Sequence, residues 1–170
     1  MALSIDASIA TPSANSYADL AWVNAYAQTA IDSDAWNLLD DTQVKILYIL
    51  RARRLMDSRV YYPGRRVQYS QALEWPRIWV SHPSSGYYNT DIIPDAVKDA
   101  QSQLALYLAM TTTNTFGTLE TSNFDHLKVG PIDITFSKNG STEGMAYFAN
   151  VIIPILETGK CVQVGARLTR

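Results

Sequence analysis

Apolar residues recur at helical spacing in four stretches of the chain, and they predict four helices. The stretches are residues 17–29, residues 42–57, a third that begins at Pro94 and ends in the threonine-rich residues 111–118, and residues 145–158. Asn15 or Ser16 is expected to cap the first helix, and Asp40 or Asp41 the second. Pro154 lies inside the fourth helix and removes one backbone hydrogen bond, which predicts a kink.

The remaining stretches lack helical periodicity and alternate in part between apolar and polar residues. We therefore predict a mainly α protein, a bundle of about four helices with a small β segment or hairpin and extended N- and C-terminal arms. The whole chain of 170 residues is expected to form a single domain. Its parts are an N-terminal arm (1–15), a helical core (16–158) that includes a long ordered loop (58–93) and a β segment (126–138), and a C-terminal arm (159–170).

The two arms hold few residues that anchor them to the protein's own core. The N-terminal arm is expected either to dock on a neighbour or to be disordered, and the C-terminal arm is a second candidate for docking. Their apolar side chains are the candidate partner-binding residues, namely Leu3, Ile5, Val162, Val164 and Leu168.

The long loop is rich in aromatic side chains. Two of the four tryptophans lie in "QALEWPRIWV", residues 71–80. Trp75 and Trp79 either form a ligand cage or base-stacking platform, or they act as a hydrophobic plug that pins the loop onto the helices. Aromatic clusters are more often core than site, which favours the plug, with Trp75, Pro76 and Trp79 as structural anchors. The bond before Pro76 is a candidate for the cis form.

Charge is polarised along the chain, although the net charge is only −2. Residues 41–77 hold eight basic and three acidic residues, a local charge of +5 that leaves −7 for the rest. Two interpretations of the arginines stay open. Interleaved with Tyr61, Tyr62 and Tyr69, they contact phosphates and stack bases, or they pair with the acidic face of another subunit. The acidic net charge favours the second. The candidate subunit or DNA contacts are Arg59, Arg65, Arg66 and Arg77.

Motifs of catalysis are missing from the sequence. His82 and His126 are isolated, and we find no zinc-protease, phosphate-loop, dinucleotide or nucleophile-elbow pattern. The single cysteine, Cys161, excludes an internal disulfide framework and a cysteine-rich zinc site. We therefore expect no enzymatic activity, no cofactor and no metal. The first residues lack a signal-peptide pattern, and the longest apolar run is too short for a bilayer, so we expect a soluble protein without membrane contact.

Five segments that follow one another along the chain resemble those of a known family. They are "ANSYADLAWVNAY" (14–26), "ILRARRLMDS" (49–58), "YPGRRVQYSQALEWPR" (62–77), "IPDAVKDAQSQLAL" (93–106) and "KVGPIDITF" (128–136). The series resembles a family of small tailed-phage proteins that are encoded among the head genes. Its members are often labelled DnaT-like single-strand DNA-binding proteins, but they resemble head-to-tail adaptors, also called head-completion or connector proteins.

The resemblance implies a structural virion protein at the head–tail junction that is made in the host cytoplasm. It implies a homo-oligomeric ring, commonly a dodecamer, that binds the portal protein and a tail or nozzle protein. Double-stranded DNA would pass through the lumen without sequence-specific binding. Polarised charge suits head-to-tail packing around such a ring. The alternative is a single-stranded DNA-binding module that uses the Arg/Tyr-rich segment 59–77.

Overall fold

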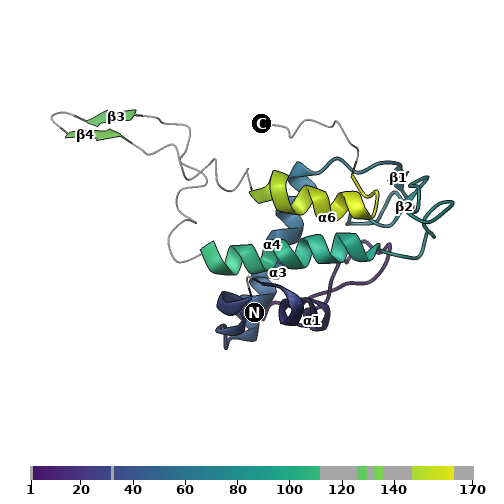
Figure 1. The fold of residues 1–170 in the computed structure, drawn as a ribbon, viewed down its shortest axis with the longest axis horizontal. Coiled ribbons are helices and arrows are strands. Elements are labelled where there is room, and N and C mark those ends of the chain that lie inside the picture. The colour runs from purple at the N-terminus through teal and green to yellow at the C-terminus, as the bar shows by residue number, and fades with distance from the viewer. Residues whose placement is uncertain (1, 32, 112–125, 130–131, 136–146, 163–170) are drawn as a thin grey trace.

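The computed structural model describes residues 2–31, 33–111, 126–129, 132–135 and 147–162. Its centre is α4 (Asp95–Thr111), which packs against α1 (Leu20–Thr29), α3 (Thr42–Arg59) and α6 (Ile153–Thr158). Figure 1 shows α3 crossing behind α4 and α6 running along it, with the short strands β1 and β2 beyond one end of the helices. The predicted mainly α fold is confirmed.

The first helix begins later than predicted. Asp19, rather than Asn15 or Ser16, is its N-cap, and the Asp19 carboxylate accepts a hydrogen bond from the backbone N–H of Trp22 at 2.7 Å. The preceding backbone is held by another helix, because the N–H groups of Tyr17 and Ala18 donate to Gln101 Oε1 of α4 at 2.9 and 3.1 Å. A buried glutamine thus satisfies these two donors and holds the backbone that precedes the helix.

The second predicted helix is α3, which extends two residues beyond the predicted end. Asp41 is its N-cap and accepts from the backbone N–H of Gln43 at 2.8 Å. A short helix that the pattern did not predict, α2 (Asp34–Asn37), precedes it and buries Trp36. One turn of helix is too short to show a period, so the sequence indicated only a turn with an apolar insert there.

The predicted long loop holds a small antiparallel pair, β1 (Arg65–Arg66) and β2 (Arg77–Ile78). Arg65 pairs with Ile78, and Arg66 pairs with Arg77. Gly64 precedes β1 with a φ of +70°, and a Cβ on it would lie 2.2 Å from the carbonyl oxygen of Ile78. The turn therefore needs a glycine at this position.

Near the C-terminus the structure resolves the predicted fourth helix into two parts. A π-helical turn, η1 (Phe148–Ile152), is followed directly by α6. The change of helix type lies next to Pro154, which has no N–H to donate and is the expected cause of an irregularity there. The predicted β segment contains β3 (His126–Val129) and β4 (Ile132–Thr135), which pair antiparallel. The rest of that segment lies outside the described residues.

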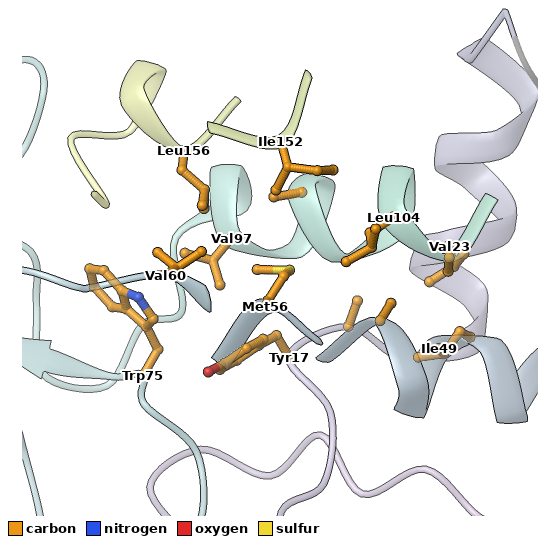
Figure 2. Close-up of a cluster of buried hydrophobic side chains, with 14 of the residues drawn as sticks. Tyr17, Val23, Ile49, Met56, Val60, Trp75, Val97, Leu104, Ile152 and Leu156 are labelled. Carbon is orange, nitrogen blue, oxygen red and sulfur yellow. The ribbon is translucent and has the colours of Figure 1, made fainter. Parts of the chain in front are cut away.

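The hydrophobic core joins all the main elements, as Figure 2 shows. One continuous cluster contains Val23 of α1, Ile49 and Met56 of α3, and Leu104 of α4. Trp75 of the long loop reaches the same cluster at its other end. The loop is therefore part of the core on its inner side, which is why a segment with so little regular structure is ordered.

The N-terminal segment lies against its own chain, which corrects the expectation that it lacks anchors there. The backbone N–H of Leu3 donates to Gln43 Oε1 at 2.6 Å, and Ile5 packs against the core. Asn15 closes the segment, because its side-chain amide donates to Ser4 O and its Oδ1 accepts from Asp6 N. Binding of a partner by this arm stays a prediction.

The C-terminal arm is described only at its start. Val162 packs against the core, while Val164 and Leu168 lie outside the described residues.

Candidate nucleic-acid interface

Arg77 is a buried structural residue, so its assignment as a subunit or DNA contact needs correction. Its guanidinium donates to the carbonyl oxygens of Pro63 at 2.7 Å, Gly64 at 2.8 Å and Glu74 at 3.2 Å. It also forms a 2.6 Å ion pair with the Glu74 carboxylate. These contacts use the fork of N–H donors that only arginine offers, and they fix the two ends of the β1–β2 pair.

Trp75 occupies the place that the plug interpretation gave it. Its side chain is 0% exposed and meets Tyr62 and Tyr88 edge to face, with centroid distances of 6.2 and 5.8 Å. The peptide bond between Trp75 and Pro76 is cis, and Pro76 is buried. Tyr62 is buried beside Trp75, so it is not available to stack on bases.

Trp79 behaves in the opposite way, and its assignment as an anchor is corrected. Its side chain is 64% exposed, and its backbone has a φ of +63°, in the left-handed region. A bulky residue in that region is an outlier that costs about 1–3 kcal/mol. The backbone therefore turns the indole outward, away from the core that Trp75 enters.

The exposed indole has a cationic neighbour. The Arg65 guanidinium lies 4.3 Å from the centroid of the Trp79 ring, in cation–π geometry. Arg65 belongs to β1 and Trp79 directly follows β2, because Arg65 is opposite Ile78, the residue before Trp79. The pairing of two short strands thus brings together two side chains that are fourteen positions apart in the sequence.

Further aromatic side chains point to solvent along the same loop. Tyr69 is 98% exposed, and Tyr61 and Tyr87 are also exposed. The sequence pattern alone does not identify Tyr87 as part of this group. An isolated antiparallel β-bridge pairs Tyr87 with Ser81, which lies two residues after Trp79 in the sequence. The available signal was Gly86 in a serine-rich stretch, which is typical of a turn, and the structure gives it a φ of +68°.

The other candidate arginines differ in their surroundings. Arg66 is exposed and donates to Gln71 O at 3.2 Å. Arg59 ends α3 and is partly exposed. Residues 59–90 contain four arginines and one glutamate, and Arg77 neutralises that glutamate. The exposed side of the loop is therefore basic. We call Arg65, Arg66, Tyr69, Trp79 and Tyr87 the loop surface.

A largely buried carboxylate on α3 is connected to this loop by hydrogen bonds. Asp57, near the end of α3, accepts hydrogen bonds from the hydroxyl groups of Tyr17 at 2.5 Å and Tyr62 at 3.5 Å, and it pairs with Arg53 at 3.4 Å. Burial raises the pKa of Asp57 to about 6, although the Tyr17 hydrogen bond and Arg53 act in the other direction. The same Tyr17 hydroxyl accepts from the backbone N–H of Glu74 at 3.2 Å. Asp57 thus links α3 and the N-terminal segment to the loop.

Two other kinds of site were sought in the part of the chain that the structure describes. There, no group of three or more histidine, cysteine or carboxylate side chains is placed to hold a metal ion. Among the same residues, no helix combines the length and the apolar character that a membrane span requires. Cys161 is buried, and burial raises the pKa of its thiol to about 12, so it is a poor nucleophile at neutral pH.

These features define a class: a mainly helical protein whose long ordered loop presents arginines and aromatic side chains to solvent. Over residues 1–170 the chain matches the sequence model of a family described as "Putative DnaT-like ssDNA binding protein". The chain belongs to this family. No curated protein and no solved structure matches it significantly. The match gives no support to the resemblance to head-to-tail adaptors.

Proposed function

We propose that this protein binds single-stranded DNA through the loop surface. The observation that carries the proposal is Trp79, an exposed indole held in a left-handed backbone conformation with a guanidinium against its ring. A purely structural tryptophan would be expected to face the core, as Trp75 does. The description of the family agrees with this function.

The chemistry of single strands fits these side chains. Unpaired bases expose flat faces that stack on aromatic rings and on the plane of an arginine guanidinium, while phosphates attract basic groups. Arg65 covers Trp79 from one side, and a base stacking on that pair would contact a continuous flat surface. Arg66, the next residue of β1, is exposed and points to the other face of the strand pair, where it provides a second positive charge for the backbone of a strand that passes over the edge. Double-stranded DNA hides its base faces, so we expect it to bind more weakly.

The primary experiment measures binding of a labelled oligothymidylate of about 16 nucleotides, which covers the usual site sizes of single-strand binders. Fluorescence anisotropy is recorded for the wild type and for Trp79→Ala. We expect the variant to bind 5- to 150-fold more weakly, which corresponds to a stacking contribution of about 1–3 kcal/mol per base. An unchanged affinity would contradict the proposal.

The arginines are tested through the salt dependence. Replacing both Arg65 and Arg66 by alanine should reduce the slope of log affinity against log salt concentration by about 0.7 for each phosphate that the variant no longer neutralises. Lys45→Ala is the matched control, because Lys45 also makes a cation–π contact, with Trp36 at 5.5 Å. It lies near the start of α3, about 20 Å from Arg59 at the other end of that helix. The control should leave the slope unchanged.

The adaptor function stays a prediction that the family match does not support. It would require a ring of copies, a portal partner and a tail partner, and each is open to a direct measurement. Light scattering of the free protein gives its mass, and electron microscopy with portal protein shows whether a ring forms. A protein that stays monomeric and does not bind portal protein would leave single-strand binding as the better-supported function.

A further inference from the structure

A groove of about 370 Å³ lies where the N-terminal segment meets the starts of α1 and α4. Its lining comes from residues 7–9, residues 17–22 and residues 91–98, and it includes none of the five loop-surface residues. Two of its apolar side chains remain accessible, because Ile9 is 45% and Ile92 is 43% exposed. Apolar side chains that gather in one exposed hollow favour contact with a further apolar surface.

One wall of the groove offers backbone donors. The N–H groups of Ala7 and Ile9 donate to no acceptor in the part of the chain that the structure describes. Donors two positions apart are the pattern that an extended strand offers to a neighbouring strand. A peptide that adds to such an edge gains main-chain hydrogen bonds, while pockets beside the edge select its side chains. The fitting occupant is therefore an extended peptide with one apolar face.

The chain itself contains such a peptide just beyond its last described residue. Residues 163–170 read "QVGARLTR". Side chains two positions apart share one face of an extended backbone, and here every second residue is apolar, namely Val162, Val164, Ala166 and Leu168. The other face carries Gln163, Gly165, Arg167 and Thr169. This alternation matches a groove that is apolar on its floor and open to solvent.

The described chain ends close to the groove. Val162 packs against the core, and a Cβ on Gly159 would lie 2.7 Å from the Cβ of Ala96, in the first turn of α4. Ala96 precedes Lys98, which lines the groove, by two residues, or about 3 Å along the helix. Eight extended residues span about 26–29 Å. Residues 163–170 are therefore long enough to cross the start of α4 and enter the groove.

The charges of the segment and of the groove also agree. The segment carries two arginines, Arg167 and Arg170, and no acidic residue. The groove is lined by two aspartates, Asp19 and Asp91, and one lysine, Lys98. Exposed ion pairs contribute about 0–1 kcal/mol, so this attraction guides the segment toward the groove, and the apolar contact holds it there.

We propose that residues 163–170 lie in this groove of their own chain as an added extended strand, with the apolar face toward Ile9 and Ile92. The groove is then a storage site for the C-terminal arm. A neighbour that binds this arm has to compete with the groove for Val164 and Leu168. The inference does not depend on single-strand binding, because the groove and the loop surface share no residue.

The first test places a nitroxide spin label on the full-length variant Thr169→Cys and follows amide signals by NMR. Cys161 is buried and burial raises the pKa of its thiol to about 12, so the label reacts at the new cysteine. We expect strong broadening of the Ile92 and Lys98 amides and weaker broadening at Leu38, beyond the far end of α1. Absence of broadening at Ile92 and Lys98 would overturn the inference.

A mixed sample identifies the chain that supplies the segment. Isotope-labelled protein without a spin label is mixed with spin-labelled protein of natural isotope content. Docking within one chain predicts no broadening in this mixture. Broadening that equals that of the singly labelled sample would assign the groove to the arm of a second copy and overturn the inference.

A second test compares two substitutions that add the same charge on opposite faces of the segment. Leu168→Asp should move the amide signals of Ala18, Ile92 and Lys98, because the apolar contact is lost. Thr169→Asp is the matched control and should leave these signals in place. Equal effects of the two variants, or none from either, would contradict docking through the apolar face. All of these outcomes are independent of whether the protein binds oligothymidylate.

Discussion

Trp75 and Trp79 have the same side chain, lie four residues apart and occupy opposite environments, so their replacement by alanine should have opposite consequences. Trp75 is 0% exposed and packs against Tyr62 and Tyr88. Truncation of a fully buried aromatic residue costs about 3–5 kcal/mol, from lost transfer free energy and from the cavity left behind. Trp79→Ala removes an exposed ring, and surface substitutions usually change the free energy of unfolding by about 0.5 kcal/mol or less.

The measurement is urea unfolding followed by far-UV circular dichroism, a signal that does not depend on the tryptophans being replaced. Trp75→Ala should lower the free energy of unfolding by about 3–5 kcal/mol, which corresponds to a fall of roughly 10 °C in Tm for a chain of this length. Trp79→Ala should unfold like the wild type and lose affinity for single-stranded DNA. Trp75→Ala with unchanged stability, or Trp79→Ala with a large loss, would refute the assignment of inner and outer roles.

A third variant, Trp75→Phe, tests the packing in more detail. The indole Nε1 of Trp75 is buried and has no hydrogen-bond partner in the described structure. An unsatisfied buried donor costs about 1–3 kcal/mol, and phenylalanine removes it while keeping one ring. We therefore expect Trp75→Phe to lose clearly less stability than Trp75→Ala. Equal losses would mean that the phenyl ring recovers none of the packing of the indole, and they would contradict this expectation.

Three further changes test the support of the loop. Because burial raises the pKa of Asp57 from 3.8 to about 6, folding favours its protonated form. The resulting stabilisation, about 3 kcal/mol, is fully present below pH 4 and is lost as the pH rises through 6. Between pH 4 and pH 7 the free energy of unfolding of the wild type, measured by urea titration, should therefore fall by about that amount relative to that of Asp57→Asn. An equal pH dependence of the two proteins would contradict this. Arg77→Lys cannot reproduce the guanidinium fork and should speed amide exchange in β1 and β2, whereas unchanged exchange would assign Arg77 a lesser role. Gly64→Ala places a Cβ 2.2 Å from Ile78 O and should destabilise more than Gly86→Ala, whose Cβ meets nothing within 4 Å; equal losses would contradict the steric argument.

The helices of this fold were predictable because their signal is local. Apolar spacing and a capping aspartate located α3 to within two residues of its end, and Pro94 marked the start of α4. The predicted start of α1 was wrong because the actual start is set by Gln101. This residue lies more than eighty positions away and accepts hydrogen bonds from the backbone of Tyr17 and Ala18. Helix periodicity carries no information about such a distant hydrogen bond.

The candidate site was predictable only as a segment. Composition directed attention to residues 58–93, and it singled out Arg65 as a candidate contact and Trp79 as a candidate anchor. It could not separate Trp75 from Trp79, because their burial depends on the folded backbone: Trp79 has a φ of +63°, whereas Trp75 packs against Tyr62 and Tyr88. It also could not show that the Arg77 guanidinium is fully engaged in hydrogen bonds to backbone carbonyl groups while Arg65 is exposed. β pairing decides which side each arginine faces.

The buried and exposed residues of the loop perform one task together. A two-stranded pair of two residues each has little stability of its own in water. Three residues supply what it lacks. Gln71 donates to the carbonyls of Leu73 and Pro76 at 2.8 and 3.1 Å, Arg77 ties β2 to the residues before β1, and Trp75 packs the loop into the core. Because these contacts hold the backbone, Trp79 can remain in a conformation that tryptophan disfavours. A binding defect caused by a buried residue of this loop should therefore be accompanied by a loss of stability, whereas one caused by the loop surface should not.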